Sequence, residues 1–224
     1  AVDCSGSMYG EKIGIVNNTI QECIPEMRSA ADNNPNAQLL VRALQFSTGA
    51  SWITTNPVPI EDYGWQDMEA DGLTALGKAF DLLAAQLSIP PMPERALPPV
   101  IVLLSDGQPT DDYKNASDKL RKLPWFRIAV KIAISICQDA DAEVLIEFTG
   151  HKELVLQANN AAALAKMIKW ASTTASMVSA PSSKPMNSMP AAAPAGSMQT
   201  STSSAAVPSA SDPFAPANNG APLV

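Results

Sequence analysis

Basic residues, histidine and cysteine are scarce in this sequence. Its 224 residues include 15 Lys and Arg, 22 Asp and Glu, one His and three Cys, and the formal net charge is -7. Binding to a nucleic-acid backbone relies on clustered Lys and Arg, so we expect no nucleic-acid partner. The three widely spaced cysteines, Cys4, Cys23 and Cys137, form neither a disulfide framework nor a thiolate zinc pattern. A reducing compartment, the cytoplasm, fits this composition best.

Long apolar runs are also missing. The most strongly apolar run covers residues 100–104, whereas a membrane-spanning helix needs about 20 apolar residues. No charged segment followed by an apolar one opens the sequence as a signal peptide would. We therefore expect no association with a membrane.

The composition changes sharply after residue 176. From residue 177 to residue 224, Ser, Ala, Pro, Met and Thr dominate without hydrophobic periodicity, and such a segment cannot bury a core. The sequence therefore predicts one folded domain at residues 1–176 and a disordered tail at residues 177–224.

Within the predicted domain, apolar runs alternate with amphipathic segments. Three- and four-residue spacing of apolar side chains predicts helices, and short apolar runs bounded by turn residues predict strands. Residues 56–72 read as a long acidic loop. The alternation predicts an α/β fold, a doubly wound and mainly parallel sheet with helices on both faces. The predicted helices are 12–31, 74–87, 111–123, 140–148 and 159–174, and the predicted strands are 39–46, 51–55 (an edge strand), 100–104, 127–136 and 152–157.

The first loop of the chain places three oxygen-bearing side chains at alternate positions. Asp3, Ser5 and Ser7 lie between a strand end and the first helix, where open α/β sheets bind their ligands. Hard cations such as Mg²⁺ prefer oxygen ligands. The same residue types are common in ordinary helix caps, so this loop alone leaves both interpretations open.

Two later loops supply further oxygens. Thr74 stands at the start of a predicted helix, and Asp106 follows the strand at residues 100–104. Helix capping and a strand-end turn explain each residue without a metal, and both roles are compatible with coordination. Because all three loops open on the carboxyl edge of the sheet, we expect the five residues to share one Mg²⁺, with Mn²⁺ as the alternative. The predicted metal ligands are Asp3, Ser5, Ser7, Thr74 and Asp106.

This Asp-x-Ser-x-Ser, Thr and Asp set resembles the metal-ion-dependent adhesion site (MIDAS) of the von Willebrand factor type A (VWA) domain. The resemblance implies a Rossmann-like VWA fold over residues 1–174 and a non-enzymatic, protein-binding role. It implies that Ser5 and Ser7 contact the metal directly, that the other three act directly or through water, and that an Asp or Glu carboxylate of a protein partner completes the shell. It also implies a first strand longer than Ala1 and Val2, so a truncated one is expected here.

Three motifs look like those of bacterial tellurite-resistance (TerY) type VWA proteins. That likeness implies a stress-response adaptor with a protein kinase and a phosphatase as partners. The motifs are Val2-Asp3-Cys4-Ser5-Gly6-Ser7-Met8, Asp71-Gly72-Leu73-Thr74-Ala75-Leu76-Gly77 and Leu104-Ser105-Asp106-Gly107-Gln108-Pro109-Thr110-Asp111.

Two other functions remain open from the residues. Hydrolases that form an aspartyl-phosphate use an Asp at a strand end, beside Mg²⁺. Such enzymes generally have a second carboxylate two residues later, in an Asp-x-Asp pair, whereas this sequence has Ser5 at that position. The other alternative is a metal-independent scaffold. We expect Cys4 to point into the core and His151, the sole histidine, to be a solvated surface residue.

Overall fold

The computed structural model describes residues 1–33, 38–94, 96–106, 108–136 and 142–158. Two sequence-based predictions, the helix at residues 159–174 and the tail at residues 177–224, lie outside the described residues. Gly107 and Cys137 also lie outside them.

In the described part of the chain, six strands form the main sheet, in the order β4-β3-β1-β6-β7-β8. Every neighbouring pair is parallel except β3 and β4, which form the predicted antiparallel hairpin with β4 at the edge. In the centre, Val2 lies opposite Gln45 of β3 and Leu104 of β6. This order is that of a doubly wound sheet and confirms the predicted fold class. The strands are β1 (Val2–Asp3), β3 (Leu44–Phe46), β4 (Ala50–Trp52), β6 (Val100–Ser105), β7 (Val130–Ser135) and β8 (Val155–Gln157).

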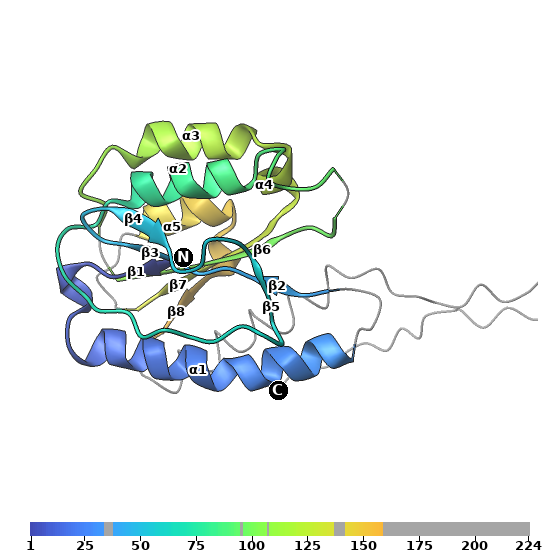
Figure 1. Ribbon diagram of the computed structural model, residues 1–224. Coiled ribbons are helices and arrows are strands. Elements are labelled where there is room, and N and C mark those ends of the chain that lie inside the picture. The colour runs from blue at the N-terminus through green and yellow to red at the C-terminus, as the bar shows by residue number, and fades with distance from the viewer. Residues whose placement is uncertain (34–37, 95, 107, 137–141, 159–224) are drawn as a thin grey trace, which may run out of the picture. The chain divides into compact units, whose positions relative to one another are not determined.

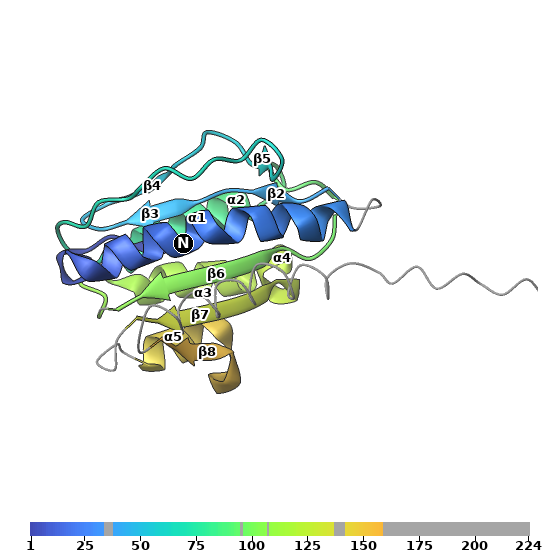
Figure 2. The ribbon, with the colours of Figure 1, turned by 90° about the horizontal axis from the view of Figure 1, so that it is seen from below.

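Helices cover both faces of this sheet. Figures 1 and 2 show α1 along one face, with α2, α3, α4 and α5 on the other. None of the helices in the described ranges is long and apolar enough to cross a lipid bilayer. The α-helices are α1 (Glu11–Asp32), α2 (Leu76–Gln86), α3 (Tyr113–Lys122), α4 (Pro124–Ile128) and α5 (Ala142–Thr149), and the 3₁₀ turns are η1 (Gly6–Met8) and η2 (Lys152–Leu154).

The sheet separates two hydrophobic clusters. Along β6, Ile101 and Leu103 pack with the α2–α5 cluster, whereas Leu104 packs with the α1 cluster. Since successive side chains of a strand point to opposite faces, a strand buried on both faces reads as a continuous apolar run. On the α2–α5 side, the rings of Phe80 and Phe148 stack at 5.7 Å. Each such buried ring contributes about 1.5–3 kcal/mol to stability.

The predicted strand at residues 39–46 is in fact two strands. The chain changes partner in the middle: Leu39 accepts a hydrogen bond from Ile60, whereas Ala43 accepts one from Ile53 beside the main sheet. The first part, β2 (Leu40–Val41), therefore pairs with β5 (Val58–Pro59) in a separate two-stranded sheet.

Other boundaries also differ from prediction. The edge strand predicted at residues 51–55 ends at Trp52. Residues 127 and 128, predicted as strand, belong to α4, because Pro124 stands in the first turn of a helix, where its fixed φ is favourable. Residues 152–154 form η2, so β8 begins only at Val155.

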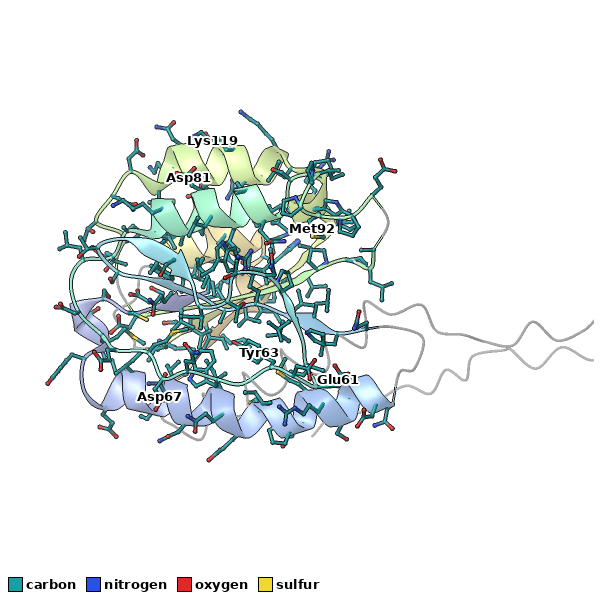
Figure 3. The ribbon with its side chains drawn as sticks, viewed as in Figure 1. Glu61, Tyr63, Asp67, Asp81, Met92 and Lys119 are labelled. Atoms are coloured by element: carbon teal, nitrogen blue, oxygen red, sulfur yellow. The ribbon has the colours of Figure 1, made fainter. Side chains whose placement is uncertain are left out.

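The acidic loop at residues 56–72 is more structured than predicted. Besides β5, it contains Tyr63 and Met68, which are buried against the α1 side of the sheet. Asn17 of α1 donates to the Met68 carbonyl at 2.9 Å and accepts from its N–H at 3.0 Å. Arg28 of α1 donates to the carbonyl of Tyr63 at 2.9 Å. Figure 3 shows Tyr63 and Asp67 beside α1, so this loop is fastened to the helix before it reaches Thr74.

Asp111 caps α2 from a different loop. Its two carboxylate oxygens accept the N–H groups of Gly77 at 3.1 Å and Lys78 at 3.3 Å, in the first turn of the helix. A Cβ at position 77 would lie 2.9 Å from Oδ2 of Asp111, so any larger residue there would displace the carboxylate from the cap. The cap joins the loop after β6 to the start of α2.

We expect Asp111→Ala to lower the free energy of unfolding by roughly 1 kcal/mol, because the first turn of α2 loses its acceptor. Urea denaturation measures the loss. Asp112→Ala is the matched control, since Asp112 makes no side-chain cap to α3 and its carboxylate accepts a hydrogen bond from the exposed Asn115. Equal losses in the two variants would contradict the capping role.

Candidate metal centre

Asp3 lies at the carboxyl end of β1 and is fully buried. Its Oδ1 accepts the N–H of Ser5 at 2.9 Å, and its Oδ2 accepts the hydroxyl of Ser105 at 2.6 Å. The first bond shapes the loop that carries Ser5. The second bond joins β1 to the end of β6, directly before Asp106.

Three of the predicted ligands form a chain of oxygens. The hydroxyls of Ser5 and Ser7 lie 3.0 Å apart, and the hydroxyl of Ser7 donates to Oδ1 of Asp106 at 2.7 Å. Oxygens about 2.1 Å from an octahedral Mg²⁺ lie about 3.0 Å apart at neighbouring corners. The spacing of the three side chains therefore fits two adjacent edges of such a shell.

Thr74 is buried on the neighbouring loop. The carbonyl of Gly72 accepts the N–H of Gly6 at 2.9 Å, which fixes this loop beside the first one. Gly72 has a φ of +80°, and a Cβ there would lie 2.2 Å from Oγ1 of Thr48, so this close turn requires glycine. Thr110 then exchanges two hydrogen bonds with the backbone of Thr74, at 2.9 and 3.1 Å. The three loops therefore meet at one edge of the sheet.

The two carboxylates of this cluster have different surroundings. Burial raises the pKa of Asp3, and the nearby charge of Asp106 adds to the rise, while hydrogen bonds from Ser105 and Ser5 oppose it. The side chain of Asp106 is also fully buried, and Lys12 of α1 forms a salt bridge with its Oδ2. The ammonium group of Lys12 further donates to the carbonyl of Ser7 at 3.0 Å.

Lys12 is the residue that the sequence analysis did not include. The motif describes only oxygen ligands, so it gives no reason to select a lysine. Its position in the sequence could have indicated a contact, because Lys12 lies in the first turn of the helix that follows Ser7. A lysine side chain at that distance can reach back to the loop.

The donor set suits a hard divalent cation. It consists of two carboxylates and three hydroxyls, all oxygen ligands of the kind that Mg²⁺ prefers. Among the described residues, no three His, Cys, Asp or Glu side chains gather as a metal-binding group. A site for a softer metal, built from thiolates or imidazoles, is therefore not found in those residues.

Neither Cys4 nor His151 joins this cluster. Cys4 is buried, with its Sγ 3.6 Å from the sulfur of Met68, and burial raises the pKa of its thiol to about 12. A thiol with that pKa stays protonated at neutral pH and is a poor nucleophile. His151 is exposed before η2. Both placements agree with the sequence-based predictions.

The chain matches the model of a known protein family. The model of the von Willebrand factor type A domain family matches residues 1–170. No curated protein matches the chain.

Several solved structures share the fold at low sequence identity. A von Willebrand factor type A protein from Catenulispora acidiphila is 16% identical, with a TM-score of 0.56, and the match covers 78% of this chain and 41% of that one. Proximal thread matrix protein 1 from the mussel byssus, solved with a zinc-occupied MIDAS motif, is 18% identical (TM-score 0.55; 78% and 44% covered). The PilB minor pilin from Streptococcus sanguinis is 17% identical (TM-score 0.57; 80% and 62% covered). The chain thus spans less than two thirds of the length of each of these proteins.

The buried charge of Asp3 makes stability depend on pH. The folded protein holds the Asp3 proton more tightly than the unfolded chain, whose carboxyl ionises near 3.8. The cost of the buried charge is therefore complete above the raised pKa of the folded state and disappears below about 3.8. We expect Asp3→Asn to melt at a higher temperature than the wild type at pH 7 in EDTA, and the difference to shrink toward pH 4.

Adding Mg²⁺ should reverse the order of the two melting temperatures. The ion stabilises only a protein that binds it, so the wild type gains and Asp3→Asn does not. Thermal denaturation with and without Mg²⁺ measures both effects. An Asp3→Asn variant that is less stable than the wild type in EDTA at pH 7 would show that the buried charge carries no net cost.

Proposed function

Because this chain belongs to the von Willebrand factor type A domain family, we propose that it is a Mg²⁺-dependent protein-binding module. The observation that carries the proposal is the chain of oxygens from Ser5 through Ser7 to Asp106, at the spacing of an octahedral shell. VWA domains commonly mediate protein interactions. In this proposal the partner donates an Asp or Glu carboxylate to the ion, with Mn²⁺ as the alternative metal.

In this proposal each of the five predicted ligands has a role in binding the ion. The hydroxyls of Ser5 and Ser7 contact the ion, and Thr74 contributes from the adjacent loop. Asp106 contributes its Oδ1, while Asp3 balances charge from beneath the loop. A shell with few anionic ligands leaves Mg²⁺ able to accept one more anionic oxygen. An acidic side chain of the partner meets that requirement.

A binding role suits Asp3 better than a catalytic one. An aspartyl-phosphate hydrolase uses the strand-end carboxylate as its nucleophile. Here both oxygens of Asp3 accept hydrogen bonds, from Ser5 and Ser105, and the side chain has no access to solvent. We therefore propose that the protein is not an enzyme.

Two exposed apolar side chains flank the proposed site. Tyr9 is 80% exposed and directly follows η1, which contains Ser7, and Leu73 is 58% exposed next to Thr74. Exposed aromatic and apolar side chains beside a polar centre are typical of protein-binding surfaces. Their position supports a protein as the partner.

Two features support the finer parts of the proposal. The mussel protein of similar fold has a zinc-occupied MIDAS motif, which supports a divalent metal here. The three motifs around Asp3, Thr74 and Asp106 support a tellurite-resistance (TerY) type stress-response adaptor, with a kinase and a phosphatase as partners. Cys4 is a free, buried thiol, which supports a proposed cytoplasmic location.

A pull-down from the source cells with Mg²⁺ or with EDTA tests this function. We expect wild-type protein to capture its partner only with Mg²⁺, and Ser5→Ala to capture little in either condition, because it lacks one ligand. Ser51→Ala is the control, since Ser51 is an exposed serine on β4 outside the site. Calorimetry with Mg²⁺ and Mn²⁺ on the same proteins reports metal binding separately.

Other results would favour the alternatives. Capture that is insensitive to both EDTA and Ser5→Ala would indicate the metal-independent scaffold. Turnover of a generic phosphate ester that disappears in Asp3→Asn would indicate a hydrolase.

We also expect Tyr9→Ala and Leu73→Ala to weaken partner capture about five- to tenfold while leaving Mg²⁺ binding unchanged, because they remove apolar contact area but no ligand. Ile128→Ala, at a similarly exposed position on α4, is the control and should have no effect. Quantitative binding of the captured partner measures the change. Loss of Mg²⁺ binding in Tyr9→Ala would instead assign that residue to the metal loop.

A further inference from the structure

Lys12 places a positive charge at the proposed metal site. Its ammonium group pairs with Oδ2 of Asp106 and donates to the carbonyl of Ser7. The other oxygen of Asp106 accepts from the hydroxyl of Ser7. The Asp106 carboxylate therefore binds the Ser7 hydroxyl with one oxygen and the Lys12 ammonium group with the other.

The position of Lys12 in α1 supports a role for this residue at the proposed site. Lys12 stands in the first turn of the helix, where the macrodipole disfavours a positive charge. Its side chain is 35% exposed, so it could extend into water and avoid the loop. It instead turns toward Asp106, whose side chain is fully buried. The contact offsets the unfavourable helix position.

A second cation at Asp106 must share that carboxylate with the ammonium group. Two like charges a few ångströms apart repel each other strongly where protein limits the access of water. The repulsion lowers the affinity for a divalent ion, and the same charge raises the attraction of the site for an anionic group.

We propose that Lys12 is a positioning residue that sets the affinity of this site for divalent cations and favours a carboxylate ligand, through its contact with Asp106 and Ser7. The proposal rests on the metal-dependent function above. Lys12 weakens the hold on the metal and leaves more positive charge facing the partner. The site is therefore weaker for the free ion than its oxygen ligands alone would make it.

Titration with Mn²⁺, followed by electron paramagnetic resonance of the free ion, tests this role on the full chain. We expect Lys12→Met to bind Mn²⁺ roughly tenfold more tightly, because the methionine keeps the apolar stem and removes the charge. Lys12→Arg should bind like the wild type. Lys78→Met is the matched control. The ammonium group of Lys78 donates to the carbonyl of Thr48, so this substitution removes the same charge at a position that does not contact Asp106. It should change the affinity less than about threefold.

The outcomes separate this proposal from the function on which it rests. Mn²⁺ binding that is equal or weaker in Lys12→Met, with binding retained in the wild type, overturns the role of Lys12 and leaves the metal site standing. Absence of Mn²⁺ binding in both proteins overturns both. Lys12→Gln, a polar replacement, gives a second measurement if the melting curve shows that Lys12→Met is unfolded. Tighter binding in Lys12→Met, or in Lys12→Gln where Lys12→Met is unfolded, supports the proposal.

Discussion

The hydrogen bond between the Ser105 hydroxyl and Asp3 joins the two strands on which the proposed site depends. It connects the end of β1 to the end of β6 in the centre of the sheet, with Asp3 fully buried. Through Oδ1, the same carboxylate also shapes the loop that carries Ser5. A buried charge held only by neutral donors is costly, as the raised pKa of Asp3 reflects. That cost supports the proposal of a cation at this edge.

The loops are held together by groups that are not themselves proposed ligands. Thr110 binds the backbone of Thr74, and Asp111 caps α2, so the loop after β6 is fixed to the loop before α2. Gly72 allows its loop to approach Gly6 within hydrogen-bond distance. The positions of the oxygens are therefore set by backbone contacts between loops. Such a site is largely formed before a ligand arrives, which lowers the entropy cost of binding.

The local signals in the sequence predicted the elements better than their partners. The run at residues 100–104 predicted β6, because a strand buried on both faces needs apolar residues at every position. The spacing of Asp3, Ser5 and Ser7 left both metal binding and helix capping open, and only the addition of Thr74 and Asp106 favoured the prediction of a metal site. Sequence did not predict the division between β2 and β3, because β2 pairs with β5, in a segment that reads as an acidic loop. Lys12 was missed because its partner Asp106, in the loop that follows β6, lies far away in the sequence.

The formal charges around the proposed site bear on the ligand that we propose for it. Asp3 and Asp106 supply two negative charges, and Lys12 supplies one positive charge. A divalent ion bound among them would leave an excess of one positive charge in a partly buried place. One carboxylate from a partner cancels that charge, whereas a neutral ligand leaves it and a phosphate dianion exceeds it. Because burial strengthens each of these interactions, the proposed preference for a single acidic side chain would arise as much from Lys12 as from the ion.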